Sequence, residues 1–521
     1  MRSRLKSKSA VYAGDAAMDL SWRMSSTVSR SRLVEEAGGM HQIGDVAGFE
    51  EAPTRGPCQP DIIPAYQVTW LAMASSSLSE SGKVEDSGRC HPTRIADSAG
   101  YPSLFNPVLI TVVIYSFTTC LPIPIHPRLY YFSPPPPAFS FTKVKDAFEP
   151  SLVDVFTKLS NALAGSNRTA LLDIALAIPD LLSPSCQPRA KVFAPLQHYM
   201  TSVYTLVVAV CATQNIELDS PGGIDTRVVF IDASENTSAI QASDSSRFGP
   251  ILDIQSLANS RRCWDYVFYL SNTTGQTLAN CFTNSVGSQA RDGTAASMQA
   301  ITSQPDWAIP DRLLIPDDQH SFTPHYSVVV GGTFDHLHVG HKLLLTAVAL
   351  VLEPLDREHE GRLTIGVTGD ALLVNKKYAE FLESWEARWQ STAAFLTAIM
   401  DFSPGKKSPQ IERAFAPVPN GKTVLVRIQP NLAFEFVEIS DPFGPTITEE
   451  NLGAIVVSKE THSGGAAVNE ERVKKGWKGL AVFEVDVLQS GEASTTTDVE
   501  GFESKISSTD IRRRRVHLAK V

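Results

Sequence analysis

One segment, from Val328 to Leu345, constrains the fold of this chain more than any other. It reads VVVGGTFDHLHVGHKLLL, an apolar run typical of a buried parallel strand, followed by a glycine pair and the start of a helix. In such a βα unit the ligand lies at the carboxyl end of the strand, where the helix N-terminus favours an anion. The polar residues expected there are Thr333, Asp335, His338 and His341. The pattern therefore predicts a site for a nucleoside triphosphate.

Three glycines fit this prediction. Gly331 and Gly332 would let backbone amides approach the ligand, and Gly340 would keep the helix N-terminus open to phosphate oxygens. The alternative interpretation is a pair of histidines that only cap the helix. That alternative does not require Thr333 and Asp335 at the same strand end, so we favour the phosphate site.

The string GTFDHLHVGH, residues 332–341, resembles the signature of the HxGH nucleotidyltransferases. The resemblance is specific because a strand, Gly-Gly-Thr-Phe-Asp and His-x-Gly-His follow one another in one contiguous order. It implies an enzyme that joins a nucleoside monophosphate from ATP or CTP to a substrate phosphate and releases pyrophosphate.

The chain from residue 324 onward alternates between strand-like and helix-like segments. Strands are predicted at 327–330, 362–367, 423–428 and 454–457, helices at 384–400 and 466–475, and an extended segment at 480–488. Alternation of this kind implies right-handed crossovers and a parallel sheet with helices on both faces. The sequence therefore predicts a Rossmann-like α/β nucleotidyltransferase domain at 324–521, with its site at the strand C-termini.

Within that superfamily the chain most resembles the eukaryotic, fungal-type phosphopantetheine adenylyltransferases. The blocks that carry this resemblance are IGVTGDALLVNKK (365–377), ESWEAR (383–388), SDPFGP (440–445), VVSKETHSGGAAVNEER (456–472) and ISSTDIR (506–512). The resemblance implies transfer of AMP from ATP to 4'-phosphopantetheine, giving dephospho-coenzyme A and pyrophosphate. One alternative is a CTP-dependent cytidylyltransferase for an alcohol phosphate, although ISSTDIR lacks that family's Arg-Thr-Glu-Gly-Ile-Ser block. The other is a non-catalytic scaffold of the same fold.

The resemblance also implies roles for individual residues. Thr333 and His341 would hold the phosphates around the bond being made, and His338 would pack beside the nucleotide. The attacking phosphate is already an anion, so positioning and electrostatic stabilisation suffice, with Mg²⁺ carried by ATP and no protein metal site. The other expected nucleotide-binding residues are Gly331, Gly332, Phe334, Asp335, Gly340, Ser507, Ser508, Thr509 and Arg512.

Several lysines and arginines are candidates to bind the substrate phosphate or the triphosphate of ATP. Lys376 or Lys377 would act in catalysis, Lys376 would also meet the substrate phosphate, and Arg388 would bind the substrate. Bacterial relatives grip ATP with an arginine after the fourth strand, whereas SKETHSGG stands at that position here. Lys459 and Arg472 are the candidates to replace that arginine.

The chain before residue 324 has a different character. Residues 1–140 lack a sustained period and include a polyproline run at 134–137, so they are expected to be a disordered or mis-predicted leader. Residues 141–300 are expected to form a separate α/β domain of unknown role, with helices at 151–164 and 196–212 and a strand at 227–231. The blocks PRAKVFAPLQ and GPILDI resemble an extension found in fungal relatives. Residues 301–323 would be a linker.

Composition limits the partners and the compartment. A net charge of −10 argues against a dedicated nucleic-acid binder, and the apolar run at 108–121 is too short to span a membrane. The seven cysteines show no CxxC spacing, which favours a reducing compartment. We expect the cytoplasm, with mitochondria as the alternative suggested by the basic N-terminus. Since the sequence has no Walker-type loop, a separate dephospho-coenzyme A kinase would take the product.

Overall fold

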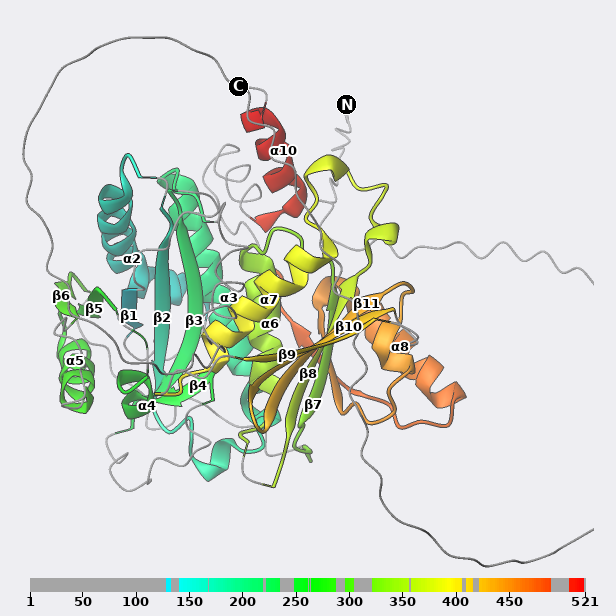
Figure 1. Cartoon of the computed structure of the whole chain (residues 1–521). Coiled ribbons are helices and arrows are strands. Elements are labelled where there is room, and N and C mark those ends of the chain that lie inside the picture. The colour runs from blue at the N-terminus through cyan, green and yellow to red at the C-terminus, as the bar shows by residue number, and fades with distance from the viewer. Residues whose placement is uncertain are drawn as a thin grey trace, which may run out of the picture. The chain divides into compact units, whose positions relative to one another are not determined.

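A computed structural model gives the fold of this chain. It describes residues 128–132, 140–166, 168–218, 222–234, 248–260, 262, 264–286, 296–303, 321–355, 358–404, 409–415, 421–488 and 506–519. The expected leader before residue 128 and the apolar run at 108–121 lie outside the described residues. Everything described belongs to one compact unit that contains two sheets (Figure 1). Among the described helices, none is long and apolar enough to cross a bilayer.

The N-terminal sheet has six parallel strands in the order β4-β3-β2-β1-β5-β6. They are β1 (Arg128–Phe132), β2 (Ala170–Ile178), β3 (Ile224–Asp232), β4 (Ile251–Asp253), β5 (Tyr266–Leu270) and β6 (Ser297–Ile301). The central strand β1 lies before residue 141, so the sequence places the start of this domain too late. The reason is that RLYYF is only five residues long and runs into the polyproline segment, which hides it.

The helices of this part are α2 (Phe141–Leu163), α3 (Ala190–Thr213), α4 (Ile254–Ala258) and α5 (Thr273–Ser285). The two helices expected from the sequence are confirmed, but both begin earlier than predicted. Each predicted start follows a proline, and the structure places Pro150 and Pro195 inside α2 and α3. Proline usually ends a helix because it lacks an amide hydrogen. The buried apolar faces of both helices outweigh that local penalty here.

The C-terminal sheet has seven strands in the order β13-β12-β7-β8-β11-β10-β9. They are β7 (Ser327–Gly332), β8 (Gly361–Thr368), β9 (Gln410–Phe415), β10 (Lys422–Gln429), β11 (Leu432–Ile439), β12 (Ala454–Ser458) and β13 (Ala481–Val485). The strand order reverses between β7 and β12. In a sheet of this class the ligand crevice lies at the carboxyl ends of the strands at such a reversal.

One part of this sheet departs from the expected parallel arrangement. Strand β10 runs antiparallel to both β9 and β11, whereas β11 pairs with β8 in parallel. The sequence prediction had one strand here and missed β11, LAFEFVEI, which follows β10 after a two-residue turn. A turn that short makes a hairpin rather than a crossover.

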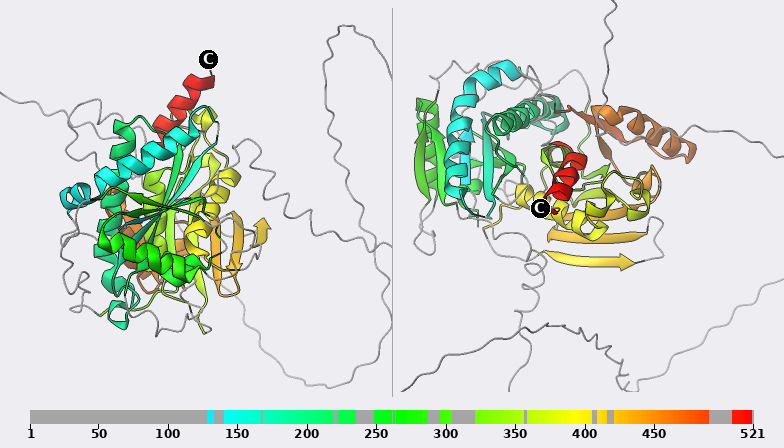
Figure 2. Two further views of the ribbon diagram at one scale, coloured as in Figure 1. Left: turned by 90° about the vertical axis from the view of Figure 1, so that its left-hand side faces the viewer. Right: turned by 90° about the horizontal axis from the view of Figure 1, so that it is seen from above.

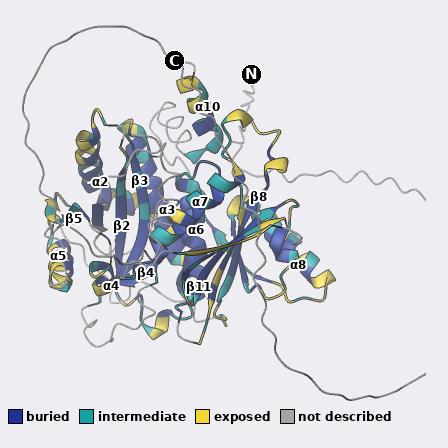
Figure 3. Cartoon of the chain, viewed as in Figure 1, coloured by how far each residue is buried: buried dark blue, intermediate teal, exposed yellow. Residues whose placement is uncertain are grey.

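Helices cover both faces of the C-terminal sheet (Figure 1). They are α6 (Val339–Val351), α7 (Trp385–Met400) and α8 (His462–Lys474), with α10 (Ser508–Ala519) at the end of the described chain. Helix α6 contains no exposed residue, because it packs against β7 and β12 on one side and against α3 and α7 on others (Figure 3). One continuous apolar core runs through both sheets. A smaller one, including Val329 and Val468, lies under α8.

Candidate functional site

The loop after β7 has an unusual backbone. Phe334 and His336 both have positive φ, at 52° and 46°, a conformation that side chains other than glycine rarely adopt. Gly332 is needed beside them, since a Cβ there would lie 2.8 Å from the Phe334 ring. The two positive-φ residues turn the chain sharply between β7 and α6. Strained backbone of this kind is typical of ligand-binding loops.

Phe334 was expected among the nucleotide-binding residues, and its side chain is fully buried. Its ring centroid lies 5.5 Å from that of His341. The aromatic ring therefore forms the floor under the histidine and leaves only the backbone of Phe334 for a ligand. Around Gly331 no atom would lie within 4 Å of an added Cβ, so the backbone there is open to a ligand.

His338 and His341 stack at the start of α6, with ring centroids 3.9 Å apart and planes inclined by 24°. His338 is the N-cap residue of α6, yet its side chain makes no capping hydrogen bond, so the helix-cap alternative is not supported. Among the described residues, no hydrogen-bond partner is found for the buried Nδ1 atom of either ring. Burial lowers the pKa of His341 to about 4, and burial together with His341 lowers the pKa of His338. Both imidazoles are therefore neutral near pH 7.

Asp335 is fully buried and holds the site together. Its Oδ1 accepts a hydrogen bond from the backbone N–H of Glu383 at 2.9 Å, and its Oδ2 forms an ion pair with Arg512. Its backbone carbonyl accepts a hydrogen bond from the Ser508 hydroxyl at 2.9 Å. The carboxylate thereby connects the β7 loop to the segment before α7 and to α10. Asp335 is at the expected place, but its carboxylate binds the protein rather than being left open to a ligand.

Like Asp335, Arg388 is buried and forms its hydrogen bonds within the protein. Its side chain is fully buried, and all three guanidinium nitrogens donate hydrogen bonds. The acceptors are the carbonyls of Glu383 and Thr333, at 3.0 and 2.8 Å, and Oδ1 of Asp370 at 2.6 Å. Direct substrate binding by Arg388, expected from the sequence, does not fit this geometry. Arg388 instead fixes the carbonyl of Thr333, so it positions the loop that carries the site.

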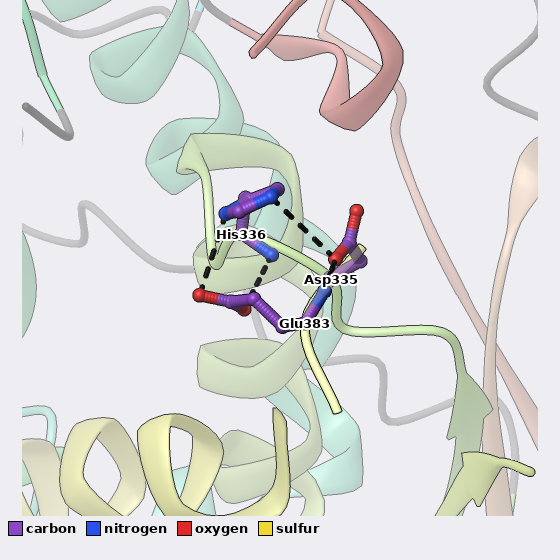
Figure 4. A group of neighbouring side chains, drawn as sticks. All are labelled: Asp335, His336 and Glu383. Atoms are coloured by element: carbon purple, nitrogen blue, oxygen red, sulfur yellow. Dashed lines mark hydrogen bonds and ion pairs between the residues drawn. The ribbon is translucent and has the colours of Figure 1, made fainter. Parts of the chain in front are cut away.

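Three residues of this region form a group that could hold a metal ion: Asp335, His336 and Glu383 (Figure 4). His336 Nε2 donates to the carbonyl of Phe381 at 2.8 Å, and its Nδ1 lies 3.3 Å from Oε1 of Glu383. Burial alone would lower the pKa of His336, but the neighbouring Glu383 carboxylate raises it above its ordinary value. Both ring nitrogens thus already face an acceptor oxygen of the protein. The group fits a buried ion-pair network better than a metal site.

The expected lysines lie on the loop after β8, and both side chains are exposed. The backbone carbonyl of Lys377 accepts a hydrogen bond from Arg512 Nε at 3.0 Å. Arg512 also donates to the Thr509 hydroxyl at 3.2 Å, and Ser507 accepts from the backbone N–H of Asp510 at 3.3 Å. Helix α10 therefore packs beside the lysine loop (Figure 2). Arg512, expected as a ligand, is buried within this network.

The two candidates to replace the bacterial arginine separate clearly. Arg472 is fully buried and donates to four backbone carbonyls, those of Thr446, Glu449, Glu450 and Lys478. It closes the loop before β12 and is not accessible to a ligand. Lys459 follows β12, its side chain is 61% exposed, and it pairs with Asp486. Of the two residues, only Lys459 lies at the carboxyl end of β12, next to the expected ligand crevice.

The sequence missed Asp370, His336 and Glu383 as parts of this network. Glu383 lies in ESWEAR, yet its role depends on the positive φ of His336, which turns that backbone N–H toward the carboxylate at 2.8 Å. Local patterns carry no signal for such a turn, because non-glycine residues rarely adopt it. Thr333, His338, His341, Gly340 and Ser508 do gather around the carboxyl end of β7, as expected.

Two family models match this chain. Residues 329–514 match the cytidylyltransferase-like family, and residues 122–304 match a domain of unknown function (DUF8446). The first match covers the β7 loop, the histidine pair, the lysine loop and most of α10. The second covers the N-terminal sheet, and it begins before β1.

Individual relatives agree with this division. A Schizosaccharomyces pombe uncharacterized protein is 36% identical over 192 residues, which are 36% of this chain and 48% of that protein. The phosphopantetheine adenylyltransferase of Saccharomyces cerevisiae is 33% identical over 198 residues, 38% of this chain and 50% of that enzyme. The chain thus spans about half the length of these two fungal relatives. The phosphopantetheine adenylyltransferase of Thermococcus gammatolerans is 32% identical over 168 residues, 32% of this chain and 81% of that enzyme.

Proposed function

Since the chain belongs to the cytidylyltransferase-like nucleotidyltransferases, as a relative of the phosphopantetheine adenylyltransferases, we propose that it transfers AMP from ATP to 4'-phosphopantetheine. The products would be dephospho-coenzyme A and pyrophosphate. The bond between the α- and β-phosphates of ATP breaks, and a bond forms between the acceptor phosphate and the α-phosphorus. The electron pair leaves with pyrophosphate.

One observation supports this proposal above the others. Two buried imidazole nitrogens, Nδ1 of His338 and Nδ1 of His341, have no hydrogen-bond partner among the described residues. Buried polar atoms are nearly always paired, so an unpaired couple at the carboxyl end of β7 points to a missing ligand. A phosphate group can satisfy both atoms, because phosphate offers acceptor oxygens and a neutral imidazole can donate from Nδ1 when that nitrogen carries its proton.

The remaining residues suit a reaction that depends on positioning. The acceptor phosphate is already an anion and needs no base, so each neutral ring can keep its proton and donate it in a hydrogen bond. Charge grows on the phosphate oxygens in the transition state, where preorganised donors are most effective. We assign this role to His341 and the backbone around Thr333, with Lys376 or Lys377 supplying a cation from the exposed loop. Arg388 supports them by holding the Thr333 carbonyl at 2.8 Å.

Magnesium would enter with ATP. The acidic residues nearest the histidines, Asp335 and Glu383, already bind Arg512 and His336, so a resident ion has no free carboxylate among the described residues of this network. Mg²⁺ bound to the triphosphate would neutralise charge there. We also propose that a separate kinase phosphorylates the product, and that the enzyme works in a reducing compartment such as the cytoplasm.

The test is pyrophosphate release by the full chain with ATP or CTP and each of three acceptors: 4'-phosphopantetheine, phosphocholine and phosphoethanolamine. The expected result is ATP-dependent turnover of 4'-phosphopantetheine alone. His341→Asn should lower kcat by about 100-fold, since losing one transition-state donor costs about that factor. Its folding, followed by circular dichroism, should be retained, because no hydrogen-bond partner for the His341 Nδ1 atom is found among the described residues.

Other outcomes would replace the proposal. Turnover of phosphocholine with CTP would assign a cytidylyltransferase for an alcohol phosphate. A protein that releases no pyrophosphate with any pair, and whose melting temperature does not rise with ATP, would be a non-catalytic member of the fold. Formation of 3'-phosphorylated coenzyme A by the pure protein would contradict the separate kinase.

A further inference from the structure

A lysine directly after the second histidine is buried against the N-terminal sheet. Lys342 is only 4% exposed, and its ammonium forms an ion pair with Asp225 at the beginning of β3. Burial alone would raise the pKa of Asp225, but Lys342 and Arg227 lower it below its usual value. The Asp225 carboxylate is therefore charged near pH 7.

This lysine is badly placed without its partner. It lies in the first turn of α6, where the helix dipole disfavours a positive charge. A buried ammonium without a counter-charge is strongly unfavourable as well. Asp225 offsets both penalties, so the first turn of α6 depends on a residue from the other sheet. That turn carries His338 and His341.

Two further polar contacts from the N-terminal part reach the same end of the C-terminal sheet. Glu217, seven residues before the start of β3, accepts from Arg514 of α10 at 2.9 Å. The Oδ2 atom of Asp486, which follows β13, lies within hydrogen-bond distance of His198 Nδ1, at 2.9 Å. The same carboxylate pairs with Lys459. The N-terminal part thus contacts the helix with the histidines, the helix with Ser508, and the aspartate that pairs with the lysine after β12.

From this convergence we propose that the N-terminal sheet positions the nucleotide site, with Asp225 acting through Lys342 to hold the first turn of α6. Asp225 is a positioning residue, because it contacts Lys342 rather than the expected ligand. The proposal gives a role to the domain of unknown function. One test of this proposal measures pyrophosphate release and therefore rests on the proposed nucleotidyltransferase function. The other test measures NMR signals of the histidines and does not rest on it.

The chain offers a matched control at the other end of the same helix. Glu353, just after α6, accepts a hydrogen bond from the backbone N–H of Arg189 at 2.8 Å. Its carboxylate therefore also joins the N-terminal part to the C-terminal part. It lies 11 residues from Lys342, about 16 Å along the helix axis. Asp225→Asn and Glu353→Gln each replace one carboxyl group of this interface by an amide without changing side-chain shape. They differ in distance from the histidines.

The experiment compares the full chain, Asp225→Asn, Asp225→Glu and Glu353→Gln. In pyrophosphate release with ATP and 4'-phosphopantetheine, Asp225→Asn should lower kcat at least about tenfold and change the KM for ATP less than about threefold. Asp225→Glu should recover most of kcat, and Glu353→Gln should stay within about twofold of the unchanged chain. The ring Cε1–H NMR signals of His338 and His341 are the second readout. They should shift in Asp225→Asn and not in Glu353→Gln.

The two readouts separate the two proposals. If the unchanged chain releases no pyrophosphate, the proposed adenylyltransferase activity fails, and the histidine signals still decide the role of Asp225. If Asp225→Asn shifts the His338 and His341 signals no more than Glu353→Gln does, the positioning role is overturned. Equal losses of kcat in these two variants would also overturn it, because they would reflect a general weakening of the interface.

Discussion

At the residue scale, the decisive feature is a pair of half-buried histidine rings kept neutral by their surroundings. His338 and His341 stack at 3.9 Å, and burial lowers the pKa of each. A phosphate that enters the site brings negative charge and favours the protonated rings. Ligand binding and proton uptake should therefore reinforce one another, because any group whose pKa rises on binding links the two equilibria.

The same pKa makes stability depend on pH. The pKa of His341 is about 4 in the fold and about 6.5 in an unfolded chain, so the unfolded state takes up the proton first as pH falls. The free energy of unfolding should then fall by at most about 2 kcal/mol between pH 7 and pH 5, less to the extent that the ring meets solvent. Urea unfolding at both pH values measures this. In His341→Asn the pH dependence should shrink by the same amount, and an unchanged slope would contradict it.

Buried arginines mark the limit of sequence reasoning at this scale. The sequence identifies Arg388, Arg472 and Arg512 as neighbours of the site, and the first and last do lie there. It cannot distinguish an arginine that binds a phosphate from one that binds backbone carbonyls, since the five donors serve either partner. Only the fold shows that all three bind the protein. The histidines were predictable because contiguous residues fix their geometry.

At the element scale, α10 closes one side of the site, and the buried ion pair between Arg512 and Asp335 is its main charged contact with the β7 loop. Arg512 and Asp335 have side chains that are 3% and 1% exposed. Removing one member leaves the other charge buried and unpaired, which typically costs about 3 kcal/mol or more. We expect Arg512→Gln to release α10 from the β7 loop. Amide hydrogen exchange over 508–519 should become faster, and turnover should fall because Ser508 is displaced.

The neighbouring arginine provides the control for this prediction. Arg513 is 50% exposed and pairs with Asp510 one turn away. An exposed pair of this kind contributes little, so Arg513→Gln should change stability by less than about 0.5 kcal/mol and leave the exchange of α10 unaltered. Fast exchange in both variants would show that α10 detaches for a reason other than the Asp335 pair.

The elements themselves were mostly predictable, with two physical exceptions. The strands β7, β8 and β12 and the helix α7 follow local periodicity, and the Ser384 side chain caps α7. Strand direction in the β10–β11 hairpin depends on turn length and pairing, which periodicity does not encode. The two helices with internal prolines are longer than predicted because tertiary burial outweighs a local penalty.

At the scale of the whole molecule, the two sheets share one apolar core. Helix α6 is the reason, since α3 from the N-terminal part packs on it and leaves it no exposed residue. Nothing in the sequence of either part announces this contact, because an apolar helix looks the same whether sheet or helix covers it. The N-terminal part, predicted as a separate domain, thus has its own sheet but shares its apolar core with the C-terminal part.

A shared core predicts how fragments behave. Residues 321–521 alone would expose the side of α6 that α3 covers, together with the unpaired Lys342, so this fragment should aggregate or unfold without a cooperative transition. Residues 122–521 retain both sheets and should unfold cooperatively at the same urea concentration as the full chain. Size-exclusion chromatography and urea titration of both fragments provide the measurement. A monomeric, cooperatively folded 321–521 fragment with full turnover would show that the N-terminal sheet is dispensable, because the nucleotide site would then hold its geometry without Asp225.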